Sequence, residues 1–196
     1  IATNAVLSPW GIAFNASQRL AIEADNTWLK KNNDAGQKGL AAARSIAMLS
    51  YRHYNGYAIT QRRDKAFVPL STETTYAADN YQRYQGLKLT KRFNALCYYR
   101  LTQSMDSHDV GRNRNSVAEA LKLITAKTLV IGITSDVLYP ITEQEFLQQT
   151  IPDAQLITIT SEFGHDGFLL EYEKIETALK EFINNKKSSH LKIVNQ

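Results

Sequence analysis

Two residues that could act together in proton transfer, Asp136 and His165, each lie just beyond a short run of mainly β-branched residues. Asp136 follows residues 128–133 and His165 follows residues 155–160, and both runs are rich in β-branched residues. Such runs are typical of strands buried in a parallel sheet. A carboxylate can fix the tautomer of an imidazole and stabilise its protonated form, so that the imidazole serves as general base and then general acid. We therefore predict that Asp136 and His165 are the acid and the histidine of a catalytic triad.

Simpler explanations exist for each residue taken alone. Asp136 could cap the turn that begins at Val137, and His165, between Gly164 and Gly167, could be a surface loop residue. The pair favours catalysis, because the carboxyl ends of neighbouring parallel strands meet at one edge of the sheet. The adjacent Asp166 could bind a substrate ammonium group or cap the helix expected near Phe168, and its position alone favours the cap.

The spacing of apolar residues divides the chain into four segments. Helical periodicity predominates in the second segment, and a strand–helix–strand–helix pattern fills the third. In the second segment we expect helices over 39–54, 74–91 (with a break near Gly86) and 97–105; in the third we expect helices capped by Thr142 and over 168–184. The segments are the remnant of a core strand and turn (1–9), a helical lid (10–122), a C-terminal core segment (123–185) and a polar tail (186–196).

These segments predict an α/β protein, namely the last parallel strands and helices of an α/β-hydrolase fold with a mainly helical lid insertion. In that fold the nucleophile precedes the acid and the histidine, on a strand–turn–helix elbow of the type G-x-S-x-G. No such elbow occurs in the 196 residues, and the first residue is Ile1 rather than Met. We expect the chain to be the C-terminal portion of an enzyme whose nucleophile lies in a missing N-terminal half.

Composition restricts the kinds of partner and compartment. The chain is 43% hydrophobic and 21% charged, carries a formal net charge of +4, and has one cysteine, Cys97. It has no basic block with interleaved aromatics, no apolar run of membrane-spanning length and no signal peptide. We therefore expect a cytoplasmic protein without a nucleic-acid or membrane partner. The cluster at 106–109 (Asp-Ser-His-Asp) has no matching ligands elsewhere, so we expect an acidic helix end there and no metal site.

The order and spacing of several short motifs resemble the homoserine O-acetyltransferases, acyltransferases of the α/β-hydrolase fold. The resemblance covers most of the chain. The matching motifs are Ile12-Ala-Phe-Asn15 with Arg19, Gly39-Leu40 through Ala43-Arg44 to Tyr51-Arg52, Tyr81-x-x-Tyr84-Gln85-Gly86, Arg92-Phe93, Leu101-Thr102 with Met105-Asp106 and His108-Asp109, Ser135-Asp136-x-Leu138-Tyr139-Pro140, and Gly164-His165-Asp166-x-Phe168-Leu169.

The resemblance implies a role for five residues. Asp136 and His165 match the family's catalytic acid and histidine. Arg44 and Tyr51, seven residues apart on one helix face, match a pocket Arg for the substrate carboxylate and a pocket Tyr; otherwise they would be a surface ion-pair residue and a core aromatic. Asp166 matches the residue that meets the substrate ammonium group.

The same resemblance implies a reaction and partners. Acetyl-CoA would be a substrate rather than a bound cofactor, and its acetyl group would pass by a ping-pong route through a serine to the hydroxyl of L-homoserine, a step of methionine biosynthesis. The helical lid would cover the active site and contribute to a homodimer.

Two segments depart from the family pattern, and other functions stay open; residues 26–38 lack the family's glycine-tyrosine element. The family's Arg-Phe-Asp-Ala-Asn-Ser-Tyr reads Arg92-Phe-Asn-Ala-Leu-Cys-Tyr98 here. The alternatives are a succinyl- or serine-directed acyltransferase, a hydrolase with the same acid and histidine, and a non-catalytic dimerisation module, for which this departure is the only support.

Overall fold

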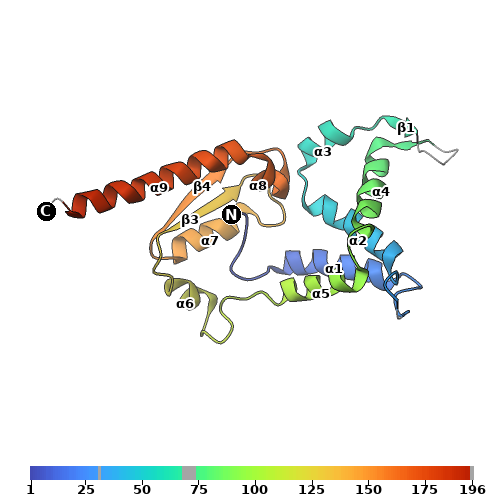
Figure 1. The fold of residues 1–196 in the computed structure, drawn as a ribbon, viewed down its shortest axis with the longest axis horizontal. Helices are drawn as coiled ribbons and strands as arrows, with labels where there is room; N and C mark the ends of the chain where they lie inside the picture. Colours follow the sequence, from blue (N-terminus) through green and yellow to red (C-terminus); the bar gives the residue numbers. More distant parts are fainter. Residues whose placement is uncertain (31, 68–73, 195–196) are drawn as a thin grey trace.

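The chain forms two lobes that lie side by side (Figure 1). The computed structural model describes residues 1–30, 32–67 and 74–194, and none of its helices within those ranges is long and apolar enough to cross a membrane. One lobe, the lid, contains α1 (Pro9–Glu23), α2 (Gln37–Ser50), α3 (Tyr54–Gln61), β1 (Lys65–Phe67), β2 (Thr74–Tyr76), α4 (Ala77–Thr90) and α5 (Ala95–Asp106). The other, the sheet lobe, contains α6 (Val117–Lys122), β3 (Thr128–Ile133), α7 (Ile141–Thr150), β4 (Ala154–Ile159), the 3-10 turn η1 (Gly164–Asp166), α8 (Gly167–Leu170) and α9 (Tyr172–Val194).

A parallel pair of strands with helices on both faces forms the centre of the sheet lobe. Strands β3 and β4 pair in parallel, with Ile131 opposite Ile157. Successive residues of β3 point to opposite faces. Ile131 packs in a cluster with Ile175 of α9, whereas Val130 packs with Leu147 of α7. The predicted order of strand, helix, strand and helix is therefore observed, and it brings the ends of β3 and β4 to one edge.

The boundaries of this lobe differ from the sequence prediction in three places. Residues 1–9 hold no regular strand: Ala2 donates a backbone hydrogen bond to Ile131, and Val6 forms an isolated bridge with Asp109. Helix α7 begins at Ile141 after Pro140, so Thr142 lies inside it and is not its cap. The predicted tail 186–196 is part of α9 as far as Val194.

The lid is mainly helical, as predicted, but its helices break elsewhere. The helix expected over 39–54 ends at Ser50, and a second helix, α3, follows it. Residues 74–76 form a short strand of an antiparallel hairpin. Helix α4 runs through Gly86 without a break. A Cβ at Gly86 would lie 2.5 Å from the carbonyl oxygen of Ala41 in α2. The glycine thus permits close packing of α4 on α2.

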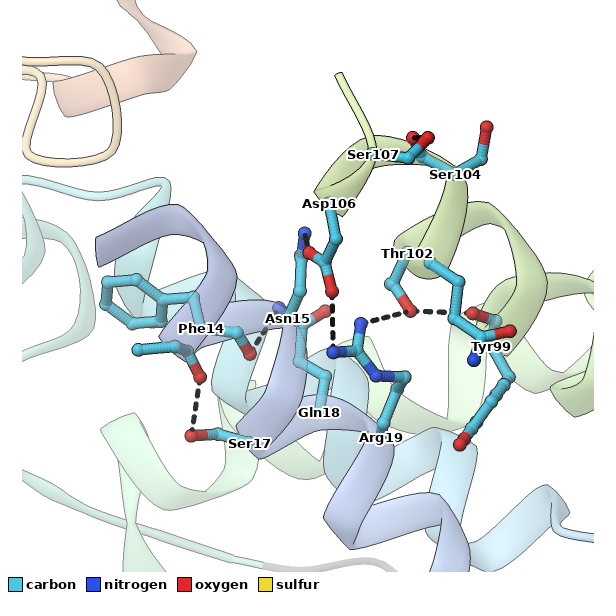
Figure 2. Close-up of polar contacts among 12 residues, drawn as sticks. Phe14, Asn15, Ser17, Gln18, Arg19, Tyr99, Thr102, Ser104, Asp106 and Ser107 are labelled. Carbon is cyan, nitrogen blue, oxygen red and sulfur yellow. Dashed lines mark hydrogen bonds and ion pairs between the residues drawn. The ribbon is translucent and has the colours of Figure 1, made fainter. Parts of the chain in front are cut away.

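A polar network joins α1 to α5 in the lid (Figure 2). Asp106 is its centre: one carboxylate oxygen pairs with Arg19 Nη2 at 2.6 Å and the other accepts from Asn15 Nδ2 at 2.8 Å. Arg19 also donates to the hydroxyl of Thr102 at 3.2 Å. The Arg19 and Asp106 side chains are largely buried, so the pair needs these extra hydrogen bonds to offset desolvation. The network fixes the register of two helices that frame α2.

Asp25 caps the lid helix that carries the candidate substrate residues. Helix α2 starts after Gly36, which has no side chain to cap it. Asp25 Oδ2 instead accepts the backbone N–H of Gly39 at 3.0 Å, and its Oδ1 accepts both the N–H and the hydroxyl of Thr27. These hydrogen bonds, of which that from Gly39 matters most, lower the pKa of Asp25 to about 2. The charged form is therefore favoured at the start of the helix.

Replacing Asp25 by alanine should lower the free energy of unfolding by about 1 kcal/mol at pH 7, the typical cost of a lost N-cap. Urea denaturation followed by hydrogen exchange of residues 37–40 measures this. Because the pKa of Asp25 is lowered on folding, its contribution should be present above its ordinary carboxyl pKa and disappear as the pH falls through about 2. Asp34→Ala is the control, since that exposed carboxylate accepts no hydrogen bond among the described residues. Equal effects of the two substitutions would contradict the capping role.

Candidate active site

Asp136 and His165 meet at the edge of the sheet, as their positions after β3 and β4 predicted. The distance from Asp136 Oδ2 to His165 Nδ1 is 2.8 Å. The side chain of Asp136 has no exposed surface and that of His165 is 16% exposed. A buried carboxylate at this distance holds Nδ1 as the donor and leaves Nε2 as the proton acceptor of the neutral ring. Among the described residues, Nε2 has no hydrogen-bond partner, so it is free to act on a group placed above the sheet edge.

Asp136 serves both of the purposes that the sequence left open. Its second oxygen, Oδ1, accepts the backbone N–H groups of Leu138 and Tyr139 at 2.8 and 2.9 Å. One oxygen therefore shapes the turn and the other orients the imidazole. The two backbone hydrogen bonds also fix the carboxylate plane, since a side chain bound at one oxygen alone could rotate.

Glycine at position 164 lets the His165 loop pack directly against the lid. Gly164 has φ +66°, in the left-handed region, and a Cβ there would lie 2.7 Å from backbone atoms of Arg52 and His53. Its N–H donates to the hydroxyl of Ser135 at 3.0 Å, and the N–H of Asp166 donates to the carbonyl of Tyr51 at 3.2 Å. The break between α2 and α3 is thus a point where the lid contacts the loop that carries His165.

Three aromatic rings surround the imidazole of His165. The ring centroids of Tyr51, Tyr139 and Phe168 lie 5.8, 5.3 and 5.1 Å from that of His165. Burial is the main cause that raises the pKa values of Tyr51 and Tyr139. The charge of Arg44 opposes this rise at Tyr51, whereas neighbouring groups add to it at Tyr139. Both hydroxyls therefore stay protonated and can donate hydrogen bonds at neutral pH. Sequence reasoning selected Tyr51 but not Tyr139 or Phe168, although all three fall within the matching motifs.

The Tyr51 ring lies between Arg44 and His165. The guanidinium carbon of Arg44 is 5.4 Å from the centroid of the Tyr51 ring, a cation–π distance, and the hydrogen bond of Arg44 to Tyr51 favours the ionised phenol. In the described ranges no carboxylate forms an ion pair with Arg44, although the side chain is partly buried. The surface ion pair that composition alone would suggest is thus not observed. A half-buried guanidinium without an anionic partner is suited to a ligand carboxylate.

Asp166 does not cap the helix that follows it. Helix α8 has no side-chain cap, and the Asp166 carboxylate faces the lid, where Oδ2 lies 3.3 Å from Arg52 Nη2. Arg52 is the functional-site neighbour that sequence reasoning missed. The available signal was its place directly after Tyr51 in the same motif.

The altered lid segment keeps its structural role. Asn94 is the N-cap of α5, where its side-chain oxygen accepts the N–H groups of Leu96 and Cys97. Asparagine and aspartate cap helices about equally well, so the change from Asp in the family pattern preserves the cap. Cys97 is exposed on the helix surface. The segment therefore gives little support to a degenerate, purely structural lid.

The charged and imidazole side chains at 106–109 each contact a different partner. Asp106 binds Arg19, His108 Nε2 lies 3.1 Å from the carbonyl oxygen of Asn4, and Asp109 accepts the N–H of Gly111. No group of three His, Cys, Asp or Glu side chains within the described residues is arranged to hold a metal ion.

Curated proteins similar in sequence to this chain are named homoserine O-acetyltransferases. A homoserine O-acetyltransferase from Cyclobacterium marinum is 44% identical over 187 residues, which are 93% of this chain and 50% of that protein. One from Salinibacter ruber is 41% identical over 85% of this chain and 47% of its own length. The chain is a relative of the homoserine O-acetyltransferases. It spans about half the length of the curated relatives it matches. No protein-family model matches it.

Solved structures that resemble the chain show which fold it has. Homoserine O-acetyltransferase from Staphylococcus aureus is 28% identical with a TM-score of 0.71, over 93% of this chain and 49% of that one. Esterase E22 reaches 0.79 at 18% identity, over 92% of this chain and 52% of its own. The α/β-hydrolase MGS-M2 reaches 0.64 at 19%, over 93% of this chain and 54% of its own. The chain thus has part of an α/β-hydrolase fold, as predicted.

Replacing Gly164 by alanine should separate the lid from the loop that carries His165. The added Cβ would meet backbone, which cannot move aside, and the left-handed conformation adds strain, so a loss of about 1–3 kcal/mol in stability is expected. Hydrogen exchange at Asp166, whose N–H binds Tyr51, should accelerate. Gly11→Ala is the matched control, because its nearest neighbour is the movable end of the Leu7 side chain. Unchanged protection at Asp166 would refute this contact as the junction.

Proposed function

We propose that this chain supplies the acid, the histidine and the amino-acid pocket of an acetyltransferase that acetylates the hydroxyl of L-homoserine. The observation that carries the proposal is the 2.8 Å Asp136–His165 contact, with Arg44 next to Tyr51 and without an ion pair to any described carboxylate. The names of the relatives support the reaction class. The nucleophile is a serine in a segment that the 196 residues do not contain.

In the first half-reaction His165 Nε2 takes the proton of that serine. The serine oxygen attacks the thioester carbonyl of acetyl-CoA, and the thiolate of CoA leaves with the proton from His165. Asp136 stabilises the imidazolium formed between these two transfers. The product of this half-reaction is an acetyl ester of the serine.

In the second half-reaction the same imidazole works on the acceptor. The homoserine carboxylate binds Arg44, and its ammonium group binds Asp166, which places the acceptor hydroxyl near Nε2 of His165. His165 removes the hydroxyl proton, the oxygen attacks the acetyl carbon, and the serine leaves with the proton. Tyr51 lies between Arg44 and the imidazole. Its ring forms the side of the acceptor pocket, where it keeps the acceptor in line and excludes water.

The direct test joins this chain to the part of the Cyclobacterium marinum relative that it does not match, by coexpression or fusion; we call the product the complemented protein. The chain alone should show no acyl transfer, and the complemented protein should release CoA from acetyl-CoA in the presence of homoserine. Succinyl-CoA, serine and water are the competing substrates, and CoA release without an acetylated amino acid would indicate a hydrolase. Turnover by the 196 residues alone would refute the proposal.

Asp136→Asn should lower kcat of the complemented protein by about 10⁴-fold. The asparagine oxygen can still accept the N–H groups of Leu138 and Tyr139, so the turn should persist, but its amide nitrogen cannot accept from His165 and reverses the tautomer. Asp109→Asn is the matched control, since Asp109 also accepts a backbone N–H in a turn but lies away from His165. A loss of less than tenfold for Asp136→Asn in a correctly folded protein would rule out its proposed role.

A further inference from the structure

The lid reaches the residue next to the catalytic histidine through a charged side chain with no assigned role. Arg52 follows α2 directly, and its Nη2 lies 3.3 Å from Asp166 Oδ2. Neither side chain is a free surface group: Arg52 is 27% exposed and Asp166 is 20% exposed. An ion pair with this degree of burial is less screened by water than a surface pair and holds its geometry better.

The guanidinium of Arg52 is itself held from the lid side. Its Nη2 donates to the hydroxyl of Tyr81 in α4 at 2.9 Å. The Tyr81 ring packs edge-on against Tyr57 of α3, with centroids 6.1 Å apart and planes at 79°. Helices α3 and α4 therefore both limit where the guanidinium can go. A side chain fixed in this way loses less entropy on binding its carboxylate, so it can fix that carboxylate in turn.

Two separate contacts from adjacent lid residues hold Asp166. The carbonyl of Tyr51 accepts the Asp166 N–H at 3.2 Å, and Arg52 binds the carboxylate. Only Oδ2 is occupied; within the described part of the chain Oδ1 accepts no hydrogen bond. Asp136 has a similar arrangement: its Oδ1 accepts backbone hydrogen bonds that hold the carboxylate in place, and its Oδ2 binds His165.

We propose that Arg52 is a positioning residue, which fixes Asp166 through Oδ2 so that Oδ1 faces the ammonium group of an amino-acid acceptor. This inference rests on the proposed function. The positive charge of Arg52 alone would disfavour an ammonium group nearby, so its benefit lies in orientation, and in keeping the lid residue Tyr51 beside His165. Acceptor binding should depend on Arg52, whereas acyl-enzyme formation, which needs only the donor, should not.

The experiment measures both half-reactions of the complemented protein. Arg52→Gln should raise the KM for homoserine on the order of tenfold, with the burst of CoA release in the absence of acceptor unchanged. 4-Hydroxybutyrate, an acceptor without the ammonium group, should be used equally poorly by both forms. Arg52→Lys should recover part of the loss, and Arg83→Gln, which removes an exposed arginine of α4 paired with Asp79, should change nothing.

A double-mutant cycle separates positioning from general damage to the lid. If Arg52 acts through Asp166, then Arg52→Gln should add less than twofold to the KM effect of Asp166→Asn. Should Arg52→Gln fail to fold, Tyr81→Phe removes the support of the guanidinium and should raise the same KM by a smaller factor. An unchanged or lowered KM in folded Arg52→Gln, or additive effects in the cycle, would overturn the inference. Absence of any acyl transfer by the unmutated complemented protein would instead overturn the proposed function.

Discussion

The site depends on one buried carboxylate that has to satisfy both of its oxygens. Asp136 is removed from water, and a buried charge is tolerated only where hydrogen bonds replace its hydration. The backbone of the turn after β3 binds one oxygen and His165 binds the other. The same buried charge therefore both orients the imidazole and stabilises the turn. This requires that the ends of β3 and β4 and the loop between β4 and α8 keep their relative positions.

The lid extends this requirement to the substrate side. Its helices are fixed to one another by polar contacts, such as Asp106 with Arg19 and Asp25 with the start of α2. The break after α2 then places three consecutive residues, Tyr51 to His53, against the backbone of the loop that carries His165. A glycine with positive φ allows that approach. Tyr51 and Asp166, two of the residues proposed to bind an amino acid, are joined directly at this contact, and Arg44 packs on the Tyr51 ring.

Sequence reasoning recovered the features that local patterns encode. Continuous β-branched runs predicted β3 and β4, and a polar residue just past each run predicted the edge at which Asp136 and His165 meet. Helix breaks were less well predicted, since Gly86 lies inside α4 and residues 51–53 interrupt a helix that shows no glycine or proline there. At Gly86 packing of α4 on α2 decides the outcome, because a glycine can serve close approach as readily as termination. The break at 51–53 coincides with the contact of these residues with the loop that carries His165.

By itself, the sequence determined the α/β pattern, the order of acid and histidine, and the motifs shared with the homoserine O-acetyltransferases. Only the tertiary structure decided which oxygen of Asp136 binds the imidazole, that Asp166 turns to Arg52 instead of capping α8, and that no carboxylate of the described residues pairs with Arg44. The reason is physical. Periodicity and spacing report which face or end of an element a residue occupies, whereas the pairing of charges depends on distances between segments more than one hundred residues apart, such as 51–53 and 164–166.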